Sequence, residues 1–274
     1  MVPSENKGTL DAWEANADFW DQTMGSEGNK YWQQLQIPCL NRIIAVDPST
    51  KVLELATGNG LGARLLASRG ASVLATDGSE KMVKLAAQRT PPDLLNKIEY
   101  RPLDATKSSA FDELLRDPEA SNGFDVVLIN MAIMDIETLD PIAEALPKLL
   151  KKGGSFVATT LHPVFFTTNA ASNTSQVSDP ETGRSRVIRT KLIEKYLHVP
   201  PWRGTAFNDQ PKWQLYFHRP LHELLGIFFK QGLVMDALEE PTFSEQQATS
   251  CKSSVHTDFS QIPVLMALRF RKIG

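Results

Sequence analysis

The sequence predicts a doubly wound α/β fold with a seven-stranded, mostly parallel sheet whose final strand is antiparallel. Three observations support this prediction. Between residues 49 and 162, short apolar runs alternate with helical segments, as expected for parallel strands joined by helical crossovers. A glycine-rich turn at residues 56–62 follows the first apolar run. The stretch 163–218 then breaks the rhythm and contains many aromatic residues.

The segment before the sheet is expected to be helical over residues 10–45, with Thr9 as the N-cap, until Pro48 and Ser49 break the pattern. The first five strands are predicted at Lys51–Leu55, Ser72–Thr76, Ile98–Pro102, Phe124–Ile129 and Gly154–Thr160. Helices are predicted over Gly62–Arg69, Glu80–Arg89 and Asp140–Leu150, the last ending at the stop signal Gly153-Gly154.

After the fifth strand, the chain is expected to insert a hairpin that covers a pocket. The pattern gives a polar stretch (Thr167–Gly183), a strand (Ser185–Leu197), a turn at 200–202 and a second strand (Trp213–Phe217). A helix (Pro220–Gln231) and an antiparallel edge pair (Leu233–Leu238 and Ile262–Phe270) should follow. We therefore predict a single domain, 1–274, divided into an N-terminal helical segment (1–48), a sheet core (49–162), the insertion (163–218) and C-terminal elements (219–274).

Composition argues against several classes of partner. The chain has 274 residues with 29 basic and 32 acidic side chains, a net charge of −3, and so lacks the basic footprint of nucleic-acid binding. A local basic run is interpreted as the solvated face of a strand: Arg184, Arg186, Arg189, Lys191 and Lys195. Two distant cysteines, Cys39 and Cys251, without metal-ligand spacing favour a reducing compartment. With neither a signal peptide nor a membrane-length run in the sequence, we expect a cytoplasmic protein without a metal.

The glycine turn carries the first functional signal. Gly58 and Gly60 follow a buried strand and allow the backbone to approach a ligand. Asp77 lies seventeen residues after Gly60, at the end of the second strand. Since both strand ends meet at the carboxyl edge of a parallel sheet, this carboxylate is placed to accept hydrogen bonds from a ribose diol.

Two further carboxylates bear on which adenosine-containing ligand binds. Residues 58–63 also fit the pattern G-x-G-x-x-A of dinucleotide folds, which leaves a nicotinamide-dependent oxidoreductase as an alternative. Glu54, at the end of the first strand, would repel a pyrophosphate but suits a cationic methionine group. Asp104, after the third strand, can accept from an adenine amino group. Three carboxylates around one pocket favour a ligand that carries ammonium and sulfonium groups.

These segments resemble the class I (Rossmann-like) S-adenosylmethionine-dependent methyltransferases, in particular the group related to ubiquinone and menaquinone biosynthesis. The matching stretches are 54–60, 77–82, 104–105, 124–131 and 150–154, while Trp13 to Asp21 is similar to the N-terminal lid of these enzymes. Ala56 departs from a pattern that often has glycine. The resemblance implies S-adenosyl-L-methionine as cofactor, held by Trp20, Glu54, Ala56, Gly58, Asn59, Gly60, Asp77, Gly78, Ser79, Met82, Asp104, Ala105, Asn130, Met131 and Ala132.

The methyl acceptor should lie where strands four and five end. His162 directly follows the fifth strand, and Pro163 fixes the chain direction, so we expect its imidazole at the pocket mouth as a general base or acceptor-orienting group. A purely structural histidine is the alternative. Acceptor contacts are also expected from four residues of the insertion, which alternatively pack the hairpin onto the sheet: Phe165, Trp202, Tyr216 and His218.

The acceptor class follows mainly from motifs that the sequence lacks. Asn130-Met131-Ala132 is not the Asn-Pro-Pro-aromatic motif that marks adenine-amino methylation, and paired-cysteine and metal-cluster signatures are missing. We therefore expect methyl transfer to an oxygen, nitrogen or sulfur atom of a small molecule, and the long aromatic insertion favours an acceptor from secondary metabolism. A methyltransferase-like fold used for binding or for a non-methylating reaction remains an alternative, because one fold hosts many functions.

Overall fold

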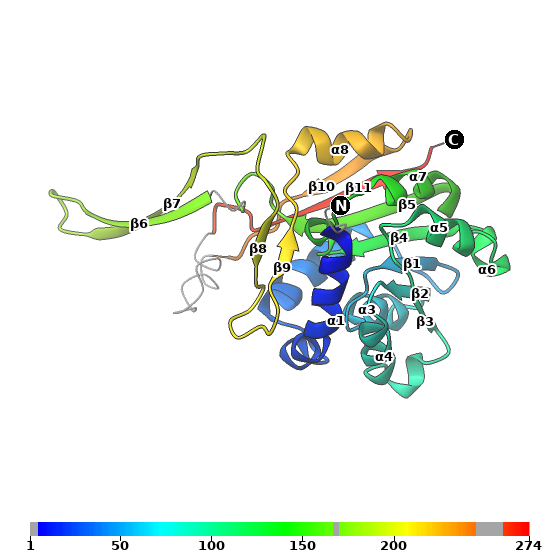
Figure 1. The fold of residues 1–274 in the computed structure, drawn as a ribbon. Helices are drawn as coiled ribbons and strands as arrows, with labels where there is room; N and C mark the ends of the chain where they lie inside the picture. The colour runs from blue at the N-terminus through cyan, green and yellow to red at the C-terminus, as the bar shows by residue number, and fades with distance from the viewer. Residues whose placement is uncertain (1–4, 167–169, 245–259, 274) are drawn as a thin grey trace.

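A twisted seven-stranded sheet forms the centre of the molecule (Figure 1). The computed structural model describes residues 5–166, 170–244 and 260–273. The strand order is β3-β2-β1-β4-β5-β11-β10, and β11 runs antiparallel to both of its neighbours. The predicted fold class is therefore confirmed. The strands are β1 (Lys51–Leu55), β2 (Ser72–Asp77), β3 (Ile98–Pro102), β4 (Phe124–Asn130), β5 (Leu150–Leu161), β10 (Val234–Glu239) and β11 (Leu265–Arg271).

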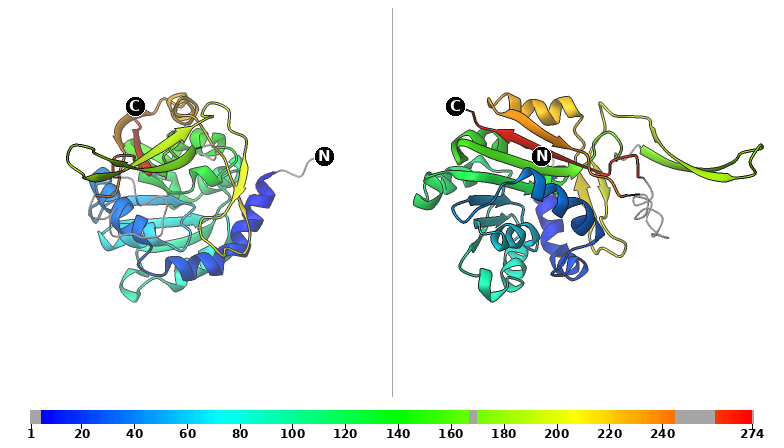
Figure 2. Two further views of the ribbon diagram at one scale, coloured as in Figure 1. Left: turned by 90° about the vertical axis from the view of Figure 1, so that its left-hand side faces the viewer. Right: turned by 180° about the vertical axis from the view of Figure 1, so that it is seen from behind.

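Helices cover both faces of the sheet (Figure 2). One core cluster packs α2 (Ile37–Ile43) and α3 (Leu61–Ser68) against the sheet. The other face carries α5 (Ser108–Leu114), α7 (Asp140–Leu149) and α8 (Leu221–Phe229). Because both faces are covered, the central strands are continuous apolar runs rather than alternating ones. The remaining helices are α1 (Glu5–Met24), η1 (Trp32–Gln36), α4 (Glu80–Gln88), η2 (Pro92–Leu94), α6 (Pro118–Ser121) and η3 (Ile133–Asp135).

Two predictions for the helices need correction. The first helix, α1, spans Glu5–Met24, so Thr9 lies inside it and is not its N-cap. The sequence analysis predicted no helix between the third and fourth strands, where α5 and α6 lie. These helices have seven and four residues, too short for a helical period to stand out.

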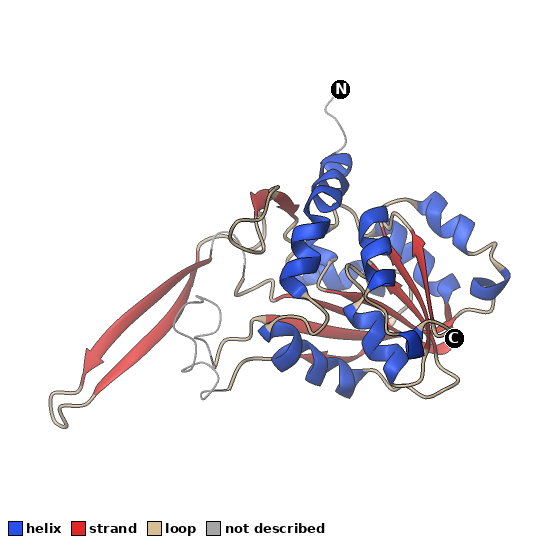
Figure 3. Cartoon of the chain, turned by 90° about the horizontal axis from the view of Figure 1, so that it is seen from below, coloured by secondary structure: helices blue, strands red, loops and turns tan. Residues whose placement is uncertain are grey.

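The insertion after β5 contains two hairpins rather than one. The polar stretch, for which no strand is predicted, contains β6 (Ala170–Ser178), which pairs with β7 (Ser185–Ile193). This first hairpin projects away from the body of the molecule (Figures 1 and 3). The second hairpin, β8 (Trp202–Gly204) with β9 (Gln214–Tyr216), lies beside α1. The two predicted strands of the insertion therefore exist but belong to different hairpins.

The structure also bears on membrane spans, cysteines and metal-binding groups. In the described ranges, no helix combines the length and apolar character needed to cross a membrane. Cys39 is a buried free thiol, and Cys251 lies outside the described residues. Across the same ranges, His, Cys, Asp and Glu side chains form no group of three arranged to hold a metal ion.

Candidate active site

A cavity of about 580 Å³ opens at the carboxyl ends of the central strands, between the sheet, α1 and the β8–β9 hairpin. The sheet-edge argument predicted this location. Gly60 and Ser79 of the predicted cofactor set are not part of the wall. The predicted cofactor residues on the wall are Trp20, Glu54, Ala56, Gly58, Asn59, Asp77, Gly78, Met82, Asp104, Ala105, Asn130, Met131 and Ala132.

The turn after β1 is built around Glu54, whose side chain is 1% exposed. Thr57 Oγ1 donates a hydrogen bond of 2.5 Å to Glu54 Oε2. A Cβ atom on Gly62 would overlap the Glu54 carboxylate, so only glycine lets α3 begin this close to the acid. Burial raises the pKa of Glu54 to about 7, although hydrogen bonds from Thr57 and Ala63 oppose the shift. The site therefore contains a buried acid that a cationic group would stabilise in its charged form.

Ala56 adopts a left-handed conformation with φ 53° in the same turn. Glycine takes this conformation at no steric cost, whereas alanine does not. The departure from the glycine pattern thus falls at a position where the backbone itself favours glycine. Met131, just after β4, has φ 55° and also lies on the cavity wall. Backbone strain of this kind is often concentrated at functional sites.

Asp77 joins the glycine turn to the end of β2. Its Oδ2 accepts a hydrogen bond of 2.8 Å from Gly58 N, and its Oδ1 accepts one of 2.9 Å from Ser79 N. Burial raises the pKa of Asp77 to about 6 despite these two backbone donors. Ser79 is the N-cap of α4, since its Oγ accepts from Met82 N, which explains why Ser79 supports the wall without being part of it.

Asp104 is the third carboxylate on the wall. Its Oδ1 accepts hydrogen bonds from Thr106 N at 3.1 Å and Thr106 Oγ1 at 2.6 Å, and Lys107 Nζ lies 3.0 Å from Oδ2. Burial raises the pKa of Asp104, but the Thr106 hydrogen bonds and the Lys107 ion pair outweigh it and leave the pKa below its usual value. Asp104 is therefore charged at neutral pH, and the structure brings all three acids to one cavity.

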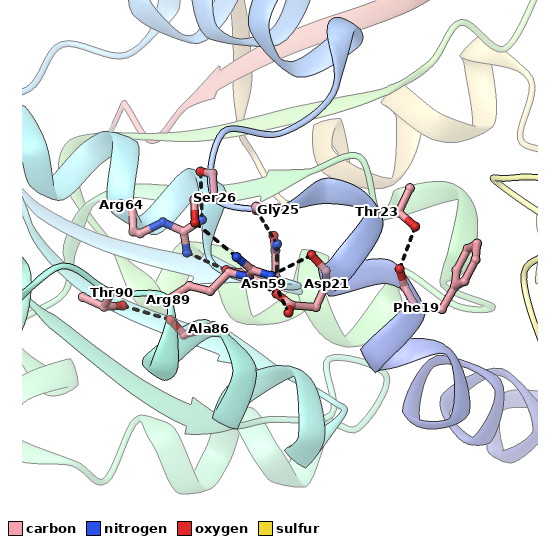
Figure 4. A network of polar contacts seen from close by, with 10 residues as sticks. All are labelled: Phe19, Asp21, Thr23, Gly25, Ser26, Asn59, Arg64, Ala86, Arg89 and Thr90. Carbon is pink, nitrogen blue, oxygen red and sulfur yellow. Dashed lines mark hydrogen bonds and ion pairs between the residues drawn. The ribbon is translucent and has the colours of Figure 1, made fainter.

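The C-terminal end of α1 is tied to the glycine turn by a polar network (Figure 4). Asp21 forms an ion pair with Arg89 of the α4 C-terminus, where Arg89 Nη2 lies 2.8 Å from Asp21 Oδ2. Asn59 Nδ2 donates to Asp21 Oδ1 at 3.3 Å and to Gly25 O at 3.0 Å. Arg64 Nη1 donates to Asn59 O at 2.6 Å. This network fixes where α1 crosses the cavity.

The part of the cavity beneath the second hairpin is aromatic. The rings of Trp202 and Tyr216 stack with centroids 4.5 Å apart, and both residues lie on the wall. The Phe207 ring packs 5.3 Å from that of Trp20 and continues this surface. Of the predicted acceptor contacts, the structure therefore brings Trp202 and Tyr216 to the cavity.

Sequence analysis missed a buried polar cluster in this half of the site. Gln214 Nε2 donates to Asp135 Oδ1 at 3.2 Å and to Tyr216 Oη at 2.8 Å. Gln210 Nε2 donates to Gln214 Oε1 at 2.8 Å. Asp135 and Gln214 are both buried, and both line the cavity. An acidic residue soon after the fourth strand was the available signal for Asp135, whereas its partner lies 79 positions away.

Arg219 holds the turn that carries Asp135. Its Nη1 donates to Ile133 O at 3.2 Å, and its Nη2 donates to Ile136 O and Glu137 O, each at 2.7 Å. Burial lowers the pKa of Arg219 to about 10, so the guanidinium remains charged at neutral pH. A single side chain thus satisfies three main-chain carbonyl groups around η3.

The structure corrects the expected position of His162. Its side chain is 4% exposed, does not line the cavity, and places Nε2 2.8 Å from Glu240 Oε1. Val164 N donates to Nδ1 at 3.2 Å, so the imidazole folds back over the turn at Pro163. Burial lowers the pKa of His162 more than Glu240 raises it. The arrangement is that of a structural histidine, the alternative left open by the sequence.

Two other predicted acceptor contacts, Phe165 and His218, are not on the wall of the main cavity. The Phe165 ring packs 4.6 Å from the ring of His162. His218 lines a small cavity of about 40 Å³ that shares Met134, Trp202 and Tyr216 with the main one, and its Nε2 lies 2.6 Å from Tyr196 O. In the basic run, Lys191 does not fit the interpretation as a solvated face, because it lies on the main cavity wall with Nζ 4.2 Å from the centre of the Phe166 ring.

Comparisons with known proteins agree with this arrangement. A family model described as a methyltransferase domain matches residues 53–158. The chain is 30% identical over 135 residues to a demethylmenaquinone methyltransferase of Clavibacter sepedonicus, an alignment that covers 49% of each protein. It is 34% identical over 111 residues to a ubiquinone biosynthesis O-methyltransferase of Caulobacter vibrioides, covering 40% of each. The chain thus aligns with half or less of the length of these two relatives.

The likeness among solved structures extends over most of the chain. A crystal structure of an S-adenosylmethionine-dependent methyltransferase from Mesorhizobium loti superposes with a TM-score of 0.64 at 24% identity. The superposition covers 90% of this chain and 100% of the other. At this level of identity the likeness shows a shared fold, including the elements outside residues 53–158.

Proposed function

Because the chain belongs to the class I S-adenosylmethionine-dependent methyltransferases, we propose that it transfers a methyl group from S-adenosyl-L-methionine to an oxygen, nitrogen or sulfur atom of a small molecule. The observation that carries the proposal is the convergence of Glu54, Asp77 and Asp104 on one cavity that continues into an aromatic half. The names of the two relatives, which refer to quinone biosynthesis, support a small-molecule acceptor.

The acids of the cavity wall fit this donor. Buried Glu54, with its raised pKa, is suited to the cationic methionine end. Asp77 keeps acceptor capacity for the ribose diol beyond its two backbone donors, and Asp104 faces the same cavity for the adenine amino group. The donor supplies an electrophilic methyl group on sulfur. The protein's part is to align the acceptor with that group and to exclude water.

The aromatic side chains of the β8–β9 hairpin, which covers the cavity, support a flat or apolar acceptor. Trp202, Tyr216 and Phe207 form its wall and come from the β8–β9 hairpin, the second half of the insertion. Such a surface suits ring compounds of the kind that specialised metabolism produces. In this proposal the β8–β9 part of the insertion covers the bound acceptor. The protein acts in the cytoplasm and has no nucleic-acid partner.

Isothermal titration with S-adenosylhomocysteine and with NADH tests the assignment. We expect micromolar binding of S-adenosylhomocysteine and none of NADH. The reverse result would establish the oxidoreductase alternative. Tight S-adenosylhomocysteine binding without transfer of labelled methyl to any acceptor would instead favour a binding or non-methylating protein.

The raised pKa of Glu54 predicts a pH dependence of donor binding. Because the pKa of Glu54 is about 7, its carboxyl group is mostly neutral at lower pH and becomes charged as the pH rises. Since the donor's ammonium group prefers the charged carboxylate, the Kd for S-adenosylmethionine should fall as the pH rises from about 5 to 7, before an α-amino group of pKa about 7.7–8.0 loses most of its protons.

The variant Glu54→Gln isolates this contribution. We expect weaker binding at pH 7.5 and a flatter pH profile, with the remaining slope due to Asp77, whose pKa is about 6. The exposed acid Glu144 on α7 provides the matched control, Glu144→Gln, which should keep the wild-type profile. An unchanged slope in Glu54→Gln would show that Glu54 does not face the cationic group.

A further inference from the structure

The turn after β4 carries a buried acid that the cofactor site does not use. Asp135 ends η3, is 8% exposed and lies on the cavity wall. Among residues 5–166, 170–244 and 260–273, one hydrogen-bond donor reaches its carboxyl group: Gln214 Nε2, at 3.2 Å from Oδ1. A carboxylate can accept about four hydrogen bonds. Asp135 therefore retains capacity to accept a proton or a hydrogen bond from a molecule in the cavity.

The position of Asp135 in the fold places it on the acceptor side of the cavity. β4 pairs in parallel with β1, so the turn after β4 adjoins the strand end that carries Glu54. The stacked rings of Trp202 and Tyr216 line the same cavity, and Gln214, between Asp135 and Tyr216 in the hydrogen-bond chain, joins that aromatic wall to the acid. A flat molecule against these rings thus has a carboxyl group at its edge.

The carboxyl group is held in a defined orientation. The two N–H groups of Gln214 are used by Asp135 and Tyr216, and its oxygen accepts from Gln210, which fixes the amide. Phe217 N donates to Met134 O at 2.7 Å, and Arg219 holds the carbonyl groups on either side of Asp135. Asp135 is therefore supported on both sides, as a group that transfers protons needs to be.

We propose that Asp135 is the proton acceptor of the reaction, and that the methyl acceptor is a hydroxyl group on a flat ring lying against Trp202 and Tyr216. This inference rests on the proposed methyl transfer. The hydroxyl oxygen forms a bond to the methyl carbon as the carbon–sulfur bond of the donor breaks. The electron pair of that bond stays on sulfur, and the hydroxyl proton passes to an oxygen of Asp135.

Acid strength narrows the acceptor to a ring hydroxyl. A phenol loses its proton with a pKa of about 10, as tyrosine does, whereas an aliphatic hydroxyl is a far weaker acid. Burial raises the pKa of Asp135 well above its usual value, which brings this pKa closer to that of a phenol and favours proton transfer between the two groups. A ring hydroxyl also brings no charge to the wall formed by Met131, Met134, Trp202 and Tyr216.

Two probes that differ by one hydrogen-bond donor test the contact. 2-Naphthol and 2-methoxynaphthalene are titrated into the complex with S-adenosylhomocysteine, using wild type and Asp135→Asn. At a pH at which the Asp135 carboxyl is ionised, we expect wild type to prefer the naphthol by about 10-fold or more, since a hydrogen bond to a charged group contributes on this scale. The variant should lose this preference, because Gln214 holds the remaining oxygen and the N–H₂ group of Asn faces the ligand. The control Glu144→Gln should keep the wild-type preference.

Transfer of labelled methyl to 2-naphthol tests the proton step. Asp135→Asn should lower kcat by roughly 100-fold or more, as is typical for loss of a general base, while its Kd for S-adenosylhomocysteine stays within about twofold of wild type. That unchanged Kd also verifies that the variant is folded.

The outcomes separate the two proposals. If S-adenosylhomocysteine does not bind the wild type, the proposed function fails. If it binds but the naphthol preference is absent or survives in Asp135→Asn, the assignment of Asp135 to a ring hydroxyl is overturned. Equal kcat in wild type and Asp135→Asn also overturns it.

Discussion

Replacing Asp77 by alanine is expected to weaken binding of S-adenosylhomocysteine by about 1–3 kcal/mol, or roughly 5- to 150-fold in Kd. Two effects together cause this loss of affinity. The ribose hydroxyls lose a charged acceptor, and the N–H groups of Gly58 and Ser79 lose the carboxylate that orients them. Isothermal titration of wild type and variant measures the difference.

Two further variants interpret this result. Asp77→Asn keeps one oxygen for a backbone donor and should fall between wild type and Asp77→Ala. Asp93, an exposed acid in η2, gives the control Asp93→Asn, which should bind as wild type does. If Asp77→Ala binds S-adenosylhomocysteine with undiminished affinity, Asp77 is not part of the cofactor site.

Arg219→Met is expected to lower the free energy of unfolding by roughly 2–4 kcal/mol. Methionine keeps the apolar stem but removes the donors for Ile133 O, Ile136 O and Glu137 O, and unsatisfied main-chain carbonyls are costly to leave without a partner. Urea unfolding should show a lower midpoint with an unchanged slope, since the folded surface remains similar.

Arg116, exposed after α5, supplies the control for this measurement. Arg116→Met should change the free energy of unfolding by no more than about 0.5 kcal/mol. Equal stability of Arg219→Met and wild type would mean that water replaces the guanidinium at the turn. In that case the orientation of Asp135 would have to come from Gln214.

The sheet could be predicted because burial imposes a pattern on it. β1 has the predicted bounds, since its apolar run ends at turn residues on both sides. The edge strand β3 also has the predicted bounds, with the apolar residues Ile98 and Tyr100 alternating with Glu99 and Arg101. β6 shows the opposite case. It pairs with β7 in a hairpin that stands away from the body, so no core selects apolar residues at every second position. Its sequence is therefore polar, and the strand was not predicted.

The site residues also differ in how far the sequence alone could place them. Glu54, Asp77 and Asp104 could be placed because each lies at or just beyond the carboxyl end of a strand, and the ends of parallel strands share an edge. The orientation of His162 could not, because it depends on Glu240, 78 positions later in the chain. The contact between Asp135 and Gln214 likewise joins distant segments. Position along a strand is local information, whereas the direction of a side chain beyond its end depends on the tertiary structure.

Helix α1, which covers the cofactor half of the cavity, is hydrogen-bonded to the β8–β9 hairpin, which covers the acceptor half. Asn16, in the middle of α1, exchanges two hydrogen bonds of 2.8 Å with the main chain of Lys212, in the loop between β8 and β9. Whatever displaces the helix therefore pulls on the loop as well. Because the Phe207 ring of the same loop also packs on Trp20 of α1, demethylated donor and methylated product would leave after one shared opening event that separates both contacts.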